Sequence, residues 1–282
     1  MKSLRLFVCQ SNGIELRKDI DKMGRLFISG DRHGRFVDLY DFCEKAETTK
    51  EDILILLGDA GINYYIKDNP NFIHDSFAQG IHNCPYVNSK DIRKIKRGLE
   101  ELPITLFCIH GNHEARPESI DTYKKKIWHG GEVYYEEEYP DLIFAKDGET
   151  YDFNGKKCLV IGGAYSIDKF YRLNRYNAGD KQYKWFSDEQ PSEATQAKIL
   201  ESITDESEFD YIFTHTCPLK YEPVEVFLPG IDQRMVDKST EEFLDVIENK
   251  LHGRYKKWYC GHYHTEKVID NLEFLFHSIK EL

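Results

Sequence analysis

The sequence contains no long apolar run, and no stretch approaches the roughly 18 consecutive apolar residues of a membrane-spanning helix. A segment that crosses a membrane is therefore not expected. The opening stretch, MKSLRLFVCQSNG, is too short and too polar for a secretory signal. These absences predict a cytoplasmic protein with no membrane partner.

Paired cysteines are also lacking. The seven cysteines are odd in number, widely scattered, and never in a CxxC spacing. Disulfide frameworks and structural zinc sites usually show paired, closely spaced cysteines. We therefore expect reduced, mostly buried thiols, as in a cytosolic protein.

Basic residues are scarce relative to acidic ones. Lys and Arg number 38, Asp and Glu number 49, and the formal net charge is −11. Proteins that bind nucleic acid or anionic membranes through their surface need the opposite balance. No extended nucleic-acid surface is expected, although this charge is compatible with an enzyme whose cations meet a phosphate locally.

Internal repeats and low-complexity linkers are absent too, so residues 1–282 are interpreted as one domain. Apolar runs that stop at Gly predict buried strands at 25–30, 52–58 and 104–111. Apolar residues at helical spacing predict helices over 35–47 and 91–103. The alternation of strand and helix favours parallel strands joined by helical crossovers.

The second half of the chain has a different pattern. Two strand-like segments flank Asn154-Gly155, a dipeptide typical of β-hairpins. Further helices are expected near 192–203 and over 239–251, before a closing hairpin. Residues 62–90 form a long insert between core elements, which either overhangs a site and selects substrate or is a plain surface excursion.

Polar residues of metal-binding type follow the strongest predicted strands. Seven candidate ligands stand there: Asp31, His33, Asp59, Asn112, His215, His262 and His264. In open parallel sheets, ligands bind beyond the carboxyl ends of the strands. If these strands share one sheet, their loops meet at one edge, where Gly111 permits close approach.

The number and type of these donors favour two cations over one. A single tetrahedral zinc ion takes about four ligands, so seven are too many for it. They suit two ions about 3.5–4 Å apart with one carboxylate between them. Imidazole and carboxylate donors without thiolate favour Mn, Fe, Zn or Co over Ca or Mg.

The donors occur in the segments GDRHG, GDAG, GNHE, THTCP and GHYH, in this order between residues 30 and 264. This series resembles the signature of the calcineurin-like metallophosphoesterase superfamily. The resemblance implies an α/β fold in which two packed mixed β-sheets are flanked by helices, a four-layer α/β/β/α sandwich. It also implies a hydrolase acting on ester bonds, a phosphatase or phosphodiesterase.

The resemblance assigns roles residue by residue. It implies a first metal held by Asp31, His33 and His264, a second held by Asn112, His215 and His262, and Asp59 as the bridging carboxylate. Two divalent ions are implied, with Mn²⁺ expected and Fe, Zn or Co as alternatives. A metal-bridging hydroxide would attack a phosphomonoester or phosphodiester. His113, the catalytic residue that binds no metal, would protonate or stabilise the leaving oxygen.

The second motif departs from the family pattern. Many members carry GDxxDRG there, whereas this sequence has GDAGINYY. The missing Asp and Arg count against the alternative of a protein Ser/Thr phosphatase. A second alternative, a catalytically silent scaffold of the same fold that binds protein partners, would be expected to have lost ligands. The sequence indicates no oligomeric state.

Two arginines are candidate contacts for the substrate phosphate. Arg32 lies inside the first motif, and Arg172 lies in the Tyr- and Arg-rich stretch SIDKFYRLNRY, which is predicted as another strand-end loop. Aromatic and basic residues in that stretch are suited to a nucleotide or another aryl phosphate. A packed surface loop without such a role is the alternative.

Overall fold

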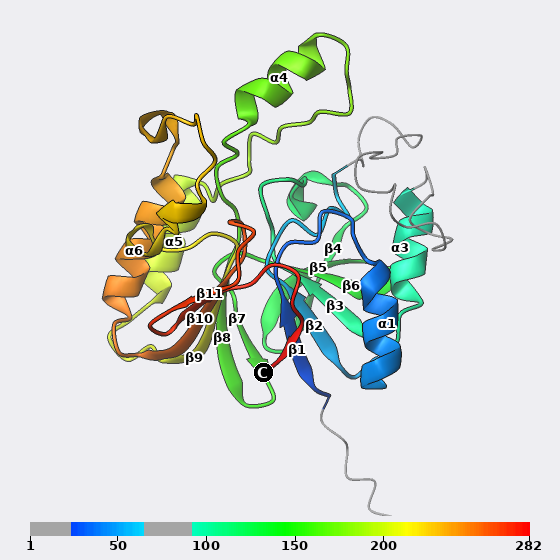
Figure 1. Ribbon diagram of the computed structural model, residues 1–282. Coiled ribbons are helices and arrows are strands. Elements are labelled where there is room, and N and C mark those ends of the chain that lie inside the picture. The colour runs from blue at the N-terminus through cyan, green and yellow to red at the C-terminus, as the bar shows by residue number, and fades with distance from the viewer. Residues whose placement is uncertain (1–23, 65–91) are drawn as a thin grey trace, which may run out of the picture.

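The computed structural model describes residues 24–64 and 92–282. Two β-sheets pack face to face, and helices cover the outer face of each (Figure 1). The larger sheet has seven strands in the order β13-β1-β2-β3-β6-β5-β4. Its parallel strands are β1 (Leu26–Ser29), β2 (Ile53–Leu56), β3 (Thr105–Cys108) and β6 (Tyr139–Ala145). Its antiparallel strands are β4 (Lys124–Trp128), β5 (Gly131–Glu136) and β13 (Lys280–Glu281).

The smaller sheet has six strands in the order β11-β12-β10-β9-β8-β7. Its parallel strands are β8 (Lys156–Ile161), β9 (Phe209–Thr214), β10 (Tyr255–Cys260) and β12 (Leu272–Phe274). The edges are the antiparallel strands β7 (Thr150–Phe153) and β11 (Lys267–Ile269). Each sheet thus has a parallel centre, which brings the carboxyl ends of its central strands to one edge.

Helices cover both sheets. Figure 1 shows α1 (Val37–Ala46) and α3 (Ile92–Glu100) over the larger sheet, and α5 (Glu193–Ser202) and α6 (Ser239–Lys250) over the smaller one. The helix α4 (Lys169–Asn177) stands beyond the ends of the strands, away from both outer layers. Four short 3₁₀ turns complete the described helices: Pro117–Ser119, Leu219–Tyr221, Val224–Val226 and Gln233–Met235.

Apolar side chains fill all three spaces between the layers. Successive residues of a strand point to opposite faces, so Ile28 joins the core between the sheets while Phe27 packs toward α1 and α3. In the same way, Tyr259 faces the space between the sheets and Trp258 packs toward α6. Because both faces are covered, the central strands are nearly continuous apolar runs, which made them visible in the sequence.

The expected α/β fold of two flanked mixed sheets is confirmed. The strands predicted at 25–30, 52–58 and 104–111 correspond to β1, β2 and β3, and the predicted helices correspond to α1, α3, α5 and α6. Asn154 and Gly155 join β7 to β8 with φ angles of 57° and 77°, the left-handed conformation of a tight hairpin.

Two features differ from the sequence analysis. The hairpin of β4 and β5 was not predicted, because β4 is an exposed edge strand that begins with three lysines and lacks an apolar face. The stretch predicted as a loop around Arg172 instead contains α4, so that prediction is wrong.

Three further expectations concern single features. Five of the cysteines are described, and all five are buried and free: Cys43, Cys108, Cys158, Cys217 and Cys260. Within the described ranges, no helix is long and apolar enough to cross a membrane. Of the predicted insert at 62–90, residues 65–90 lie outside the described residues, so its role stays a prediction, as does the single-domain assignment.

Candidate metal centre

The candidate ligands lie in five loops, each directly after a parallel strand. Residues 30–34, 58–61 and 111–114 follow β1, β2 and β3 of the larger sheet, and residues 215–218 and 261–264 follow β9 and β10 of the smaller one. We call these five segments the ligand loops. The strands do not share one sheet, and the loops converge because the carboxyl edges of the two sheets meet at the site.

The backbone of the ligand loops is unusual. Four of their residues other than glycine have positive φ angles: His33 (48°), Asp59 (44°), His262 (65°) and His264 (48°). Such residues rarely adopt this left-handed region, and each instance costs of order 1–3 kcal/mol. Strain of this kind persists where the surrounding structure enforces it, and it clusters at functional sites.

Glycines in the ligand loops allow the loops to approach one another closely. A Cβ atom at Gly58 would lie 2.1 Å from Nδ1 of His215, and one at Gly111 would lie 2.1 Å from Oδ1 of Asp59. A Cβ atom at Gly261 would lie 2.2 Å from Oδ1 of Asp31. Any side chain at these positions would therefore displace a candidate ligand, which confirms the role expected for Gly111.

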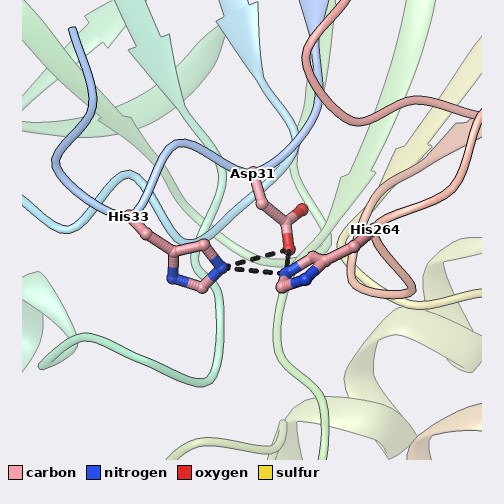
Figure 2. A group of neighbouring side chains, drawn as sticks. All are labelled: Asp31, His33 and His264. Carbon is pink, nitrogen blue, oxygen red and sulfur yellow. Dashed lines mark hydrogen bonds and ion pairs between the residues drawn. The ribbon is translucent and has the colours of Figure 1, made fainter. Parts of the chain in front are cut away.

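Figure 2 shows Asp31, His33 and His264 converging from two ligand loops. Nε2 of His33 lies 2.9 Å from Nε2 of His264. Oδ2 of Asp31 lies 3.2 Å from Nε2 of His264 and 3.7 Å from Nε2 of His33. Donors bound about 2.0–2.1 Å from one ion lie roughly 3 Å apart. This spacing fits a shared cation.

Asp59 lies between this group and a second one. Its Oδ2 is 3.8 Å from Nε2 of His33 and 3.6 Å from Nε2 of His215. Asp59 belongs to two groups of donor atoms that lie within 4.8 Å of one another, one with His33 and His113 and one with Asp31 and His215. A carboxylate in this position is suited to bridge two cations.

Each buried carboxylate has one oxygen fixed by the backbone. Oδ1 of Asp31 accepts a hydrogen bond from the amide of His262 at 2.9 Å, and Oδ1 of Asp59 accepts one from the amide of His113 at 2.7 Å. In both residues Oδ2 is the oxygen that faces the imidazoles. The backbone therefore orients one oxygen of each carboxylate toward the candidate site.

His215 and Asn112 are oriented in the same manner. Nδ1 of His215 lies 2.7 Å from the carbonyl oxygen of Leu57, which can only accept, so Nδ1 carries the proton. Nδ2 of Asn112 donates to Oγ of Ser166 at 2.8 Å. Nε2 of His215 and Oδ1 of Asn112, both acceptors, then lie 2.8 Å apart. Two facing acceptors at this distance fit a cation held jointly by them.

His262 completes the arrangement beside His215. The centroids of the two rings are 5.0 Å apart, with an interplanar angle of 67°. Burial and the neighbouring His215 lower the pKa of His262 to about 3. Its imidazole is therefore neutral at physiological pH, which is the form that binds metal ions.

The carboxylates keep their charge despite burial. Burial alone would raise the pKa of Asp31, but His215 and His264 lower it below its usual value. Burial also opposes ionisation of Asp59, and the imidazoles of His113, His215 and His33 overcome it, so its pKa is lowered. The site thus presents buried negative charge that favours cations.

Arg172 reaches the site from α4. We call residues 166–189, which include this helix, the arm. Nη2 of Arg172 lies 2.5 Å from Nδ1 and 2.9 Å from Nε2 of His113. Asp168 accepts from Nε of Arg172 at 2.6 Å, and the carbonyl oxygen of Lys184 accepts from Nη1 at 3.1 Å. The guanidinium is therefore held in a fixed place beside His113.

His113 is neutral in this setting. Burial lowers its pKa well below the usual value for histidine, Arg172 lowers it further, and Asp59 acts in the opposite direction. A guanidinium donates only and a neutral imidazole has one acceptor nitrogen, so only one of the two short contacts can be a hydrogen bond.

Arg32 has a different position from the one expected. Its side chain is buried, donates to Oγ of Ser29 at 2.7 Å, and forms an ion pair with Asp38 of α1. The structure thus turns Arg32 toward α1, which does not support the prediction of a phosphate contact.

Sequence analysis missed two residues that orient the site, Ser166 and Asp168. Ser166 anchors Asn112, and Asp168 anchors Arg172. A signal for the second was present, because Asp168 and Arg172 stand four residues apart, the spacing of an ion pair on one helix face. The serine had no such signal, since its partner is 54 residues away in the chain.

The chain is similar to a family profile and to solved structures of low sequence identity. No curated protein matches the chain. Among solved structures, one is 14% identical with a TM-score of 0.46, covering 92% of this chain and 98% of its own. The protein TT1561 of Thermus thermophilus is 12% identical with a TM-score of 0.42, and the match covers 90% of this chain and 88% of TT1561. Neither likeness is close enough to carry an argument. The profile named calcineurin-like phosphoesterase matches residues 24–272. The chain belongs to the calcineurin-like phosphoesterase family.

Proposed function

We propose that the chain hydrolyses a phosphomonoester or phosphodiester with the help of two divalent cations, with Mn²⁺ expected and Fe, Zn or Co as alternatives. The observation that carries this proposal is two close pairs of possible metal-ligand atoms, His33 with His264 and His215 with Asn112, on either side of Asp59. Two cations, when bound, would supply charge to the phosphoryl oxygens and activate a water molecule for attack on phosphorus.

The candidate ligands divide into two sets around Asp59. In this proposal Asp31, His33 and His264 hold one cation, Asn112, His215 and His262 hold the other, and Asp59 holds both. Because backbone amides and a backbone carbonyl fix the far atoms of Asp31, Asp59 and His215, the near atoms of these three side chains need little reorganisation to bind. Family membership supports this division.

His113 and Arg172 would act on the phosphoryl group itself. The neutral imidazole of His113 lies beside the candidate bridging carboxylate, with its ring centroid 5.1 Å from that of His33. Arg172 offers a buried donor that a phosphoryl oxygen would accept from. An anionic phosphate next to His113 would raise its pKa and allow it to protonate the leaving oxygen.

The test compares p-nitrophenyl phosphate with bis(p-nitrophenyl) phosphate. The protein is stripped with a chelator and then reloaded with Mn²⁺, Fe²⁺, Zn²⁺ or Co²⁺, and bound metal is measured by elemental analysis. We expect about two ions per chain and turnover of at least one ester. A phosphoserine peptide as the preferred substrate would support the protein phosphatase instead. No turnover with two ions bound would support the scaffold.

A further inference from the structure

A cavity of about 430 Å³ lies between the arm and the loops that follow β2 and β3. Aromatic side chains line it from both sides: Tyr64 from the loop after β2, and Tyr176, Trp185 and Phe186 from the arm. No residue of this cavity is a candidate metal ligand, so it is separate from the site described above.

Contacts within the protein hold these aromatic walls in place. The ring of Tyr64 meets that of Phe186 edge to face at 5.8 Å, and its hydroxyl accepts from the amide of Lys184 at 3.0 Å. The ammonium of Lys169 lies 4.1 Å from the ring centroid of Trp185. A planar ligand would therefore meet preorganised rings.

The cavity lies within a short reach of the candidate metal centre. Ala115, which lines it, is two residues from His113, so their Cα atoms are at most about 7 Å apart. Leu173, another lining residue, directly follows Arg172, whose guanidinium contacts His113. One ligand can therefore occupy the cavity and extend a phosphate to the centre.

Asn63 is a buried polar residue in the lining of the cavity. Its side chain is fully buried, and Oδ1 accepts from the hydroxyl of Tyr123 at 2.9 Å. Nδ2 is buried too, yet it donates to no group among residues 24–64 and 92–282.

Size and charge indicate which part of a substrate fits. Cavities of about 150 Å³ hold benzene, so one of about 430 Å³ is too large for a lone phenyl ring. Lys184 and the half-buried Asp188 both line the cavity, so its charged lining residues are one of each sign. The cavity therefore suits an uncharged aromatic base together with a sugar.

We propose that this cavity holds the nucleoside part of a nucleotide whose phosphate is cleaved at the metal centre. The proposal rests on the proposed function, because it names the substrate class of that site. The aromatic walls stack on the base, and Arg172 contacts the phosphate.

The first experiment measures binding without catalysis. Adenosine is titrated into metal-free protein and followed by calorimetry. We expect saturable binding that weakens about tenfold or more in Trp185→Ala and in Tyr176→Ala, the loss typical of a removed stacking partner. Trp185→Phe should restore most of it. Phe170→Ala is the matched control, since Phe170 lies on α4, is 61% exposed, and does not line the cavity.

The second experiment compares adenosine monophosphate with glycerol 2-phosphate in the metal-loaded protein. Trp185→Ala and Tyr176→Ala should lower kcat/KM about tenfold for the nucleotide, mainly through KM, and leave glycerol phosphate unchanged. Thermal unfolding confirms that the variants are folded.

The outcomes separate the two proposals. If glycerol phosphate is cleaved but adenosine does not bind, or the variants affect both esters equally, the nucleotide proposal fails and the phosphoesterase stands. Preference for phosphotyrosine over every nucleotide also overturns it. If adenosine binds through Trp185 but no ester is cleaved with metal bound, the proposed function fails and the cavity assignment stands.

Discussion

The ligand loops and the arm meet at one place but are built differently. The ligand loops are short, and backbone groups of one loop hold the side chains of another. The arm is a longer segment that leaves the smaller sheet after β8. Its contacts involve side chains: Asp168 accepts from Arg172, and the hydroxyl of Tyr64 accepts from the amide of Lys184. The difference teaches that backbone groups orient candidate metal ligands, whereas a side chain, that of Asp168, helps to orient Arg172, the expected phosphate contact.

The largest effect is expected in the ligand loops. Asp59→Asn removes the charge of the carboxylate between the two donor groups, so metal content should fall and turnover should drop on the order of 10³-fold or more. Elemental analysis and steady-state kinetics measure both. The control is Asp205→Asn, since Asp205 is exposed and outside the motifs. Wild-type metal content and rate in Asp59→Asn would refute the bridging role.

The second prediction concerns His113, where the two regions touch. His113→Ala should lower turnover by about 10²–10⁴-fold, as expected for loss of a general acid, and leave bound metal unchanged. Elemental analysis distinguishes the two effects, and His252→Ala, at a side chain 83% exposed, is the control. Loss of metal would show that His113 is a ligand, in line with its position near His33 and Asp59.

The third prediction separates the arm from the loops. Arg172→Ala should lower kcat/KM by roughly 10–100-fold, because a hydrogen bond to a charged group contributes about 1.5–3 kcal/mol. Metal content should not change. Arg172→Lys should recover only part of the rate, since a lysine lacks the planar fork. Arg175→Ala, which removes an exposed ion pair on the same helix, is the control. An unchanged rate in Arg172→Ala would exclude the phosphate contact.

The smallest effect is expected at the anchor of the arm. Asp168→Asn removes the ion pair with Arg172. Asp168 is 40% exposed, however, and the carbonyl of Lys184 still accepts a hydrogen bond from the guanidinium. Water screens a pair of this kind, so we expect only a few-fold loss in kcat/KM. Asp180→Asn, which breaks the pair with Arg175, is the control. A loss as large as that of Arg172→Ala would mean that Asp168 acts on the substrate directly.

Much of the fold was predictable because its central strands are buried on both faces. β2 and β3 are continuous apolar runs, and α1 and α6 carry apolar residues at helical spacing. The edge hairpin of β4 and β5 was not predicted, because the lysines of β4 are exposed and give no alternation of apolar and polar residues. The helix α4 was not predicted, because it lies beyond the sheets. Arg172 is its one buried residue, so α4 has no buried apolar face.

The sequence by itself determined the donors and their loops, since each motif is local: a strand ends, a glycine gives room, and a carboxylate or imidazole follows within a few residues. The family resemblance implied two sheets and the division of the ligands, but only the tertiary structure places their atoms close to one another and brings Arg172 of the arm to His113. The physical reason is distance along the chain. His33 and His264 are separated by 231 residues, so only the packing of the two sheets could bring them together.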